Sequence, residues 1–147
     1  MLRVKGCYVV MLKNSNIAIF SNKITVLNDN TKTENDRLGS IGDINFTICN
    51  HKIDDDLLVI GGDNLFNFDL HKFISFAKKK KGTSVGLYDI DDPSLVKNFG
   101  VVTVDENDKI IRFQEKPKKS ISTLISMCIY YFPIKSLDFI KKYVNLK

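Results

Sequence analysis

Cysteine is scarce in this sequence, and its three residues, Cys7, Cys49 and Cys128, lie far apart. None belongs to a C-x-x-C pair, which argues against a disulfide framework and against a zinc site. We therefore expect small buried thiols in a protein of a reducing compartment, the cytoplasm.

Long apolar runs are also absent. No stretch of 18 apolar residues occurs, so the sequence predicts no transmembrane helix and no membrane partner. The apolar run near the start, CYVVML, is interrupted by Lys13 and Asn14 too early for a secretory signal. With 147 residues, 44% of them hydrophobic, the chain suits a single domain over residues 1–147.

Acidic and basic residues are segregated along the chain. Residues 28–63 hold eight acidic and three basic groups, whereas residues 109–147 hold nine basic and two acidic groups. A basic segment suits either nucleic acid or a phosphorylated small molecule. The lysines at 78–81 end a predicted helix, where positive charge complements the helix dipole. Aromatic residues do not alternate with the basic runs, so we predict no nucleic-acid partner.

Strand-like and helix-like segments alternate. Strands are predicted at 7–12, 23–27, 54–62, 83–90 and 124–132, helices at 36–50, 67–82 and 134–144, and a hairpin at 99–117. This alternation predicts an α/β fold in which a mixed, mainly parallel sheet is flanked by helices. The unbroken apolar run at 57–60 predicts a central strand, buried on both faces, with the strands at 84–90 and 125–132 as its neighbours.

Asp63 follows that central strand, in LLVIGGDN. Open α/β sheets bind ligands beyond the carboxyl ends of their strands. A carboxylate there offers the hard oxygen ligands that Mg²⁺ prefers, and Gly61 and Gly62 let a phosphate approach the backbone. The alternative is that Asp63 and Asn64 only form a turn or cap a helix.

The segments FQEKP and NFGVV hold the other candidate residues. Glu115 and Lys116 come at the end of the second hairpin strand. A lysine neutralises a phosphate, and a carboxylate accepts hydrogen bonds from sugar hydroxyls, although an exposed ion pair is the alternative. Gly100, at the start of the first hairpin strand, leaves room for a ligand against the backbone.

Taken in order, three segments resemble motifs of the sugar-phosphate nucleotidyltransferases, and the resemblance extends over about residues 23–140. The segments are DDDLLVIGGDNLF, NFGVVTVDENDKIIRFQEKP and the strand ending in IYYF. The upstream segment ITVLNDNTKTENDRLGSIGDINF resembles the one that precedes the GD motif in that family. Those enzymes make nucleoside-diphosphate sugars from a nucleoside triphosphate and a sugar 1-phosphate.

The resemblance implies a Rossmann-like domain and assigns roles to five residues. Asp63 would bind the catalytic Mg²⁺, and Gly39, in RLGS, would lie near the nucleotide base. Gly100 would contact the sugar, and Glu115 and Lys116 would bind the sugar and its phosphate. Asp63 and Lys116 would act in catalysis by positioning and charge neutralisation, because the chemistry needs no protein nucleophile.

The sequence departs from the family pattern at three places. The glycine-rich loop G-G-x-G-T-R-L-x-P, which cradles the triphosphate, is missing, and the nearest glycine is the lone Gly6. A later metal-binding aspartate is also missing, and Met127 and Cys128 stand where the family has a glycine-containing stretch. We therefore expect an incomplete nucleotidyltransferase domain, truncated at both ends.

Two alternative functions stay open. The chain could be a catalytically inactive remnant or a non-catalytic partner subunit of the same fold. It could be a nucleotide-sugar-dependent glycosyltransferase, because DID at 89–91 has the form of the D-x-D metal motif of such enzymes. Self-association through an exposed sheet edge is open as well.

Overall fold

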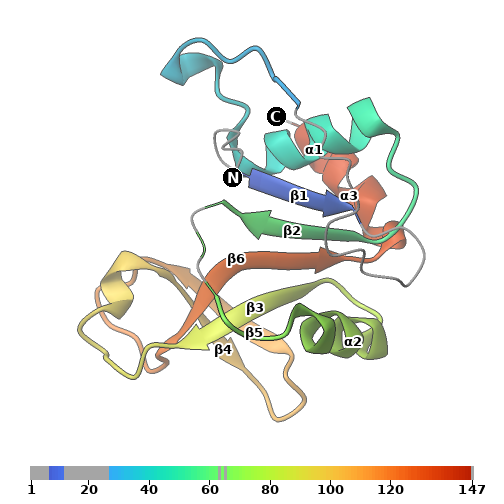
Figure 1. Ribbon diagram of the computed structural model, residues 1–147. Coiled ribbons are helices and arrows are strands. Elements are labelled where there is room, and N and C mark those ends of the chain that lie inside the picture. The colour runs from blue at the N-terminus through green and yellow to red at the C-terminus, as the bar shows by residue number, and fades with distance from the viewer. Residues whose placement is uncertain (1–6, 12–26, 63, 65, 147) are drawn as a thin grey trace. The chain divides into compact units, whose positions relative to one another are not determined.

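The computed structural model describes residues 7–11, 27–62, 64 and 66–146 (Figure 1). The chain forms two compact units, the first made of residues 1–84 and 130–147 and the second of residues 85–129. In chain order the elements are β1 (Cys7–Met11), the 3₁₀ helix η1 (Glu34–Asp36), α1 (Gly39–His51), β2 (Leu57–Gly61), α2 (Leu70–Lys80), β3 (Ser84–Asp89), the 3₁₀ helix η2 (Val96–Asn98), β4 (Gly100–Val104), β5 (Ile110–Glu115), β6 (Leu124–Phe132) and α3 (Ile134–Val144).

The core of the first unit forms between β2 and two helices. Leu57 and Val59, two residues apart on β2, share a face and are 0% and 1% exposed. They pack with residues from α1, α3 and the loop before β2, namely Ile44, Ile48, Ile53, Leu137 and Ile140. Leu58, on the opposite face of β2, is only 2% exposed. The prediction of a strand buried on both faces is therefore confirmed, which explains why its apolar residues do not alternate with polar ones.

Helices α1 and α3 lie side by side next to β1 and β2 (Figure 1). The buried residues Ile44 and Ile48 of α1 are four apart, so they lie on one face of the helix. Leu137 and Ile140 of α3 have the equivalent spacing of three. Both helices were predicted within three residues of their observed starts because this spacing is visible in the sequence.

Helix α2 begins where its capping residue predicts. The carboxylate of Asp69 accepts a hydrogen bond from the backbone N–H of His71 at 2.8 Å, which makes Asp69 the N-cap. Lys78, Lys79 and Lys80 form the last turn, as expected from the helix dipole. The helix ends at Lys80, and its C-cap Lys81 takes the left-handed conformation (φ 55°), one residue before the glycine expected to stop the helix.

The second unit is built around the β4–β5 hairpin. Gly100–Val104 pairs with Ile110–Glu115 in antiparallel register, with an irregularity between Thr103 and Val104. The hairpin predicted at 99–117 is confirmed. Val101 of β4 pairs with Ile125 of β6 and packs with Val96 and Ile90, so a small apolar cluster supports the hairpin from one side.

The strands are hydrogen-bonded in the order β1-β2-β6-β4-β5, and β3 also pairs with β6. The α/β class and the helix-flanked sheet are confirmed, and β2 is an interior strand beside β6, as predicted. The prediction that β3 is a neighbour of β2 is wrong, because β3 pairs with β6.

The strand directions also differ from the expected predominance of parallel pairing. The pairs β1–β2, β4–β5 and β4–β6 are all antiparallel. For β4 and β5 the reason is local, because a short turn joins only antiparallel strands.

Two further findings bear on the sequence predictions. Most of the strand predicted at 23–27 lies outside the described residues. Within the described part of the chain, no helix combines the length and the apolar character that a membrane span requires.

Candidate functional site

The chain turns after β2, and in the sequence the predicted metal ligand Asp63 follows that strand. The carbonyl oxygen of Gly61 accepts two hydrogen bonds from Asn64, one from its backbone N–H at 3.1 Å and one from its side-chain amide at 3.2 Å. Asn64 therefore closes the turn. Asp63 itself lies outside the described residues, so its role as an Mg²⁺ ligand stays a prediction. Over the described residues, no three His, Cys, Asp or Glu side chains gather in a way that would hold a metal.

The open end of the β4–β5 hairpin brings three predicted residues together. Gly100 is the direct cross-strand partner of Glu115. The next residue, Lys116, donates its backbone N–H to the carbonyl oxygen of Phe99 at 3.0 Å, which continues the pairing by one step. Segments 15 residues apart in the sequence thus place a glycine, a carboxylate and an ammonium group at one end of the hairpin.

Lys116 adopts a left-handed backbone conformation, with φ of 43°. This conformation costs a non-glycine residue about 1–2 kcal/mol, and a residue held in it is a reason to consider function. The bend ends β5, and Pro117, which follows, is buried. The side chains of Glu115 and Lys116 are both exposed, so both are available to a ligand.

The space above Gly100 is occupied. A Cβ atom at Gly100 would lie 2.8 Å from Cζ and 3.1 Å from Cε2 of Phe113, and 3.2 Å from Oε2 of Glu115. No side chain fits there without displacing the ring. Phe113 is 56% exposed, and the position of its ring over Gly100 was not predicted from the sequence. The available signal was its position two residues before Glu115, which places both side chains on one face of β5.

Gly39, the residue predicted to lie near a base, belongs to the first unit and begins α1. Its φ is +72°, a conformation that favours glycine, and among the described residues, its own chain neighbours and helix backbone aside, no atom lies within 4 Å of where a Cβ would be. The backbone at Gly39 is therefore open on that side. This geometry permits the predicted approach of a ligand and does not by itself identify one.

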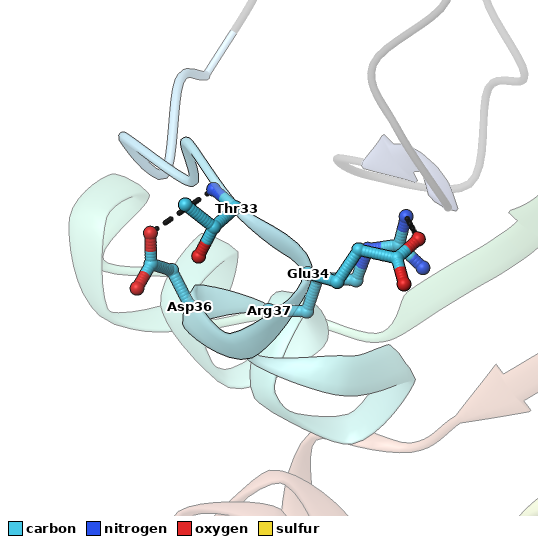
Figure 2. Close-up of polar contacts among 4 residues, drawn as sticks. All are labelled: Thr33, Glu34, Asp36 and Arg37. Carbon is cyan, nitrogen blue, oxygen red and sulfur yellow. Dashed lines mark hydrogen bonds and ion pairs between the residues drawn. The ribbon is translucent and has the colours of Figure 1, made fainter.

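The segment before Gly39 is fixed by its own side chains (Figure 2). The carboxylate of Asp36 accepts the backbone N–H of Thr33 at 3.0 Å, and Arg37 pairs with Glu34 at 2.9 Å. Hydrogen bonds from the side chain and backbone of Thr33 lower the pKa of Asp36. These contacts shape the turn that leads into α1, with Glu34 paired to Arg37 and Asp36 bonded to Thr33.

The acidic run DID is also explained by local contacts. The carboxylate of Asp89 accepts hydrogen bonds from the Thr123 hydroxyl at 2.6 Å and from the Asp91 backbone N–H at 3.0 Å. The bond from Thr123, followed by that from Asp91, lowers the pKa of Asp89. Asp89 thus holds a turn against the start of β6, and the D-x-D motif has a structural explanation here.

Comparison with known proteins agrees with these motifs. The family model described as "Nucleotidyl transferase" matches residues 15–147. The bifunctional protein GlmU of Methanocaldococcus jannaschii is 38% identical over 90 residues, which are 61% of this chain and 20% of that protein. The UTP–glucose-1-phosphate uridylyltransferase of Synechocystis sp. is 34% identical over 106 residues, 70% of this chain and 27% of that protein.

Solved structures show the same fold. A Bacillus anthracis protein described as a glucose-1-phosphate thymidylyltransferase superposes with a TM-score of 0.59 at 30% identity, over 71% of this chain and 41% of that one. An apo UDP-glucose pyrophosphorylase gives the same TM-score at 18% identity, which shows the fold alone. The chain thus spans about a fifth to two fifths of the relatives it matches.

The family model covers nearly the whole sequence, from residue 15 to residue 147. This chain therefore belongs to the nucleotidyl transferase family, among the sugar-phosphate nucleotidyltransferases.

Proposed function

We propose that this chain binds a sugar 1-phosphate at the open end of the β4–β5 hairpin and serves nucleotidyl transfer from a nucleoside triphosphate. The observation that carries the proposal is the meeting of Gly100, Glu115 and Lys116 at that end. An exposed ammonium group beside an exposed carboxylate matches the two ends of the ligand. The phosphate of the ligand binds the ammonium group of Lys116, and the sugar hydroxyls donate hydrogen bonds to the carboxylate of Glu115.

In this reaction a phosphate oxygen of the sugar 1-phosphate attacks the α-phosphorus of the triphosphate. The bond between the α-phosphorus and the bridging oxygen to the β-phosphate breaks, and pyrophosphate leaves. Lys116 offsets the negative charge of the attacking phosphate, which would otherwise be repelled by the triphosphate. Glu115 orients the sugar, and Gly39 leaves its backbone open to the nucleotide base. Positioning supplies much of the rate in such transfers.

Mg²⁺ is the proposed cofactor, with Asp63 as its ligand from this chain. A single carboxylate together with phosphate oxygens of the substrate suits the preference of Mg²⁺ for hard oxygen ligands. When bound, the ion would neutralise negative charge on the phosphates. In the sequence Asp63 comes two residues after the end of β2.

A second candidate is a non-catalytic member of the family that binds these ligands without turnover. The observation that favours it is the absence from these 147 residues of a G-G-x-G-T-R-L-x-P segment. Backbone amides of such a segment would otherwise hold the triphosphate. Both candidates require the same sugar 1-phosphate site and differ only in pyrophosphate release.

Calorimetric titration of the chain with glucose 1-phosphate tests the shared site. Lys116→Gln removes the positive charge. It should leave the left-handed backbone conformation at this position unchanged, because both residues are unbranched at Cβ. A lost charge-assisted contact is worth about 1.5–3 kcal/mol, so affinity should fall about tenfold to a hundredfold. Lys118→Gln, at an exposed position two residues on, is the matched control and should leave affinity unchanged. Equal affinity in both variants would exclude Lys116 as the phosphate ligand.

A further inference from the structure

Gly100 does not need to be glycine for its backbone. Among the described glycines only Gly39 has a positive φ. Gly100 lies in the extended strand β4, a conformation open to every residue. The requirement must therefore be the space above its Cα atom.

Phe113 and Glu115 fill that space. Glu115 is directly opposite Gly100 across the hairpin, and Phe113 is the diagonal neighbour on the same face. The edge atoms Cζ and Cε2 of the ring and the oxygen Oε2 of the carboxylate all lie within 3.2 Å of one point above Gly100. An aromatic ring laid across a strand glycine is a known device for pinning the register of a sheet.

We propose that Phe113 is a positioning residue that holds the carboxylate of Glu115 in place to receive sugar hydroxyls. This inference rests on the proposed function. Gly100 is then glycine because it must admit the ring and the carboxylate together. An exposed glutamate side chain ordinarily samples several rotamers, and a ring bounding one side removes part of that freedom before the ligand binds. The ring edge carries partial positive charge, which suits a carboxylate as its neighbour.

Glu115 and Lys116 recognise different parts of the ligand, and this gives the inference a specific signature. Loss of the ring should weaken the contact with the sugar and leave the contact between Lys116 and phosphate intact. A residue that only stabilises the fold would change both affinities together or neither of them.

The experiment titrates the full chain with glucose 1-phosphate and, separately, with inorganic phosphate. Phe113→Ala should bind glucose 1-phosphate about threefold to tenfold more weakly, the effect of one hydrogen bond no longer held in place. Its affinity for inorganic phosphate should not change. Phe113→Tyr should restore binding of the sugar phosphate, because it keeps the ring. Ile111→Ala, on the same strand and 62% exposed, is the control and should behave as wild type.

A double variant separates this role of Gly100 from direct contact with the sugar. Gly100→Ala should weaken binding of glucose 1-phosphate because its Cβ displaces the ring and the carboxylate. In a Phe113→Ala background the Gly100→Ala change should add little further loss, because the ring is already absent. Additive losses would show that Gly100 contacts the ligand independently and would overturn this part of the inference.

The remaining outcomes distinguish the two proposals. Wild-type affinity for glucose 1-phosphate in Phe113→Ala would overturn the positioning role and leave the proposed function standing. Failure of the wild-type chain to bind glucose 1-phosphate would overturn the proposed function and this inference with it.

Discussion

The phenol hydroxyl of Tyr131 donates a hydrogen bond to the carboxylate of Asp56, whose other oxygen accepts the backbone N–H of Ile134 at 3.0 Å. One carboxylate, placed just before β2, thus connects the end of β6 with the first turn of α3. Tyr131 is only 2% exposed, so its hydroxyl has little access to water as a substitute partner. The contact joins three elements of the first unit.

Tyr131→Phe should lower the free energy of unfolding at pH 7 by about 1.5–3 kcal/mol, the range for a hydrogen bond to a charged group. Urea denaturation followed by circular dichroism measures it. The control is Tyr88→Phe, which removes a hydroxyl from a side chain that is 56% exposed and should change stability little. Equal stability of the two variants would contradict the role given to Asp56.

The same contact predicts a loss of stability in alkaline solution. Burial, and next the hydrogen bond to Asp56, raise the pKa of Tyr131 above its usual value. A raised pKa in the folded state means that the unfolded chain loses this proton first. The Tyr131 hydroxyl therefore makes its full contribution to the free energy of unfolding below pH about 10. Above that pH the contribution decreases, by up to about 1.4 kcal/mol per pH unit. The difference in stability between wild type and Tyr131→Phe should shrink between pH 9 and pH 11. A constant difference would contradict this prediction.

Cys128→Gly should stabilise the protein. Cys128 is exposed and lies within β6 at φ 52°, a left-handed conformation. Relieving this strain gains about 1–2 kcal/mol, and the greater freedom of glycine in the unfolded chain takes back about 0.5–1 kcal/mol. We expect a net gain of up to about 1.5 kcal/mol in urea denaturation. Cys49→Gly, the same change within α1, should instead cost about 0.3 kcal/mol, the difference in helix propensity between the two residues. A loss in both variants would show that Cys128 is not strained.

Asp63→Asn should weaken the binding of a nucleoside triphosphate in the presence of Mg²⁺ and have little effect without it. The reason is that the neutral amide is a poorer ligand for a hard cation. Asp91→Asn is the control, because it removes a carboxylate from an exposed turn whose φ of 54° asparagine tolerates. Calorimetric titration with and without the metal measures the effect. Equal losses in both conditions would argue against metal binding by Asp63.

We also expect the isolated chain to release no appreciable pyrophosphate from a nucleoside triphosphate and a sugar 1-phosphate. No glycine-rich segment of these 147 residues would hold the leaving group in line with the attacking oxygen. A coupled pyrophosphate assay measures it. Robust turnover, abolished by Asp63→Asn, would establish the catalytic candidate over the non-catalytic one.

The helices and strands could be predicted closely because their signals are local. Asp69 predicts the start of α2, and the turn DEND between two β-rich runs predicts the β4–β5 hairpin. Strand neighbours depend on distant parts of the chain, and no local signal shows that β3 pairs with β6 instead of β2. The left-handed conformation of Cys128 within β6 was equally hidden, because cysteine shows no preference for positive φ.

The candidate site was predictable in part for the same reason. Glu115 and Lys116 are adjacent in the sequence, and Gly100 stands at a recognisable strand start. Their meeting depends on the register of the hairpin, which pairs Gly100 with Glu115 and not with a neighbour. The ring of Phe113 above Gly100 follows from that register too, and its spacing from Glu115 in the sequence shows only that the two side chains share a face of β5.

The most direct test of the sugar 1-phosphate site is a map of the backbone amides that shift when glucose 1-phosphate is added to the ¹⁵N-labelled chain. The site predicts that the largest chemical-shift changes fall on Gly100, Glu115 and Lys116, and that inorganic phosphate shifts Lys116 more than Gly100. If the changes fall instead on the lysine-rich last turn of α2, at 78–80, the ligand is attracted by surface charge alone. That result would contradict a sugar 1-phosphate site at the end of the hairpin.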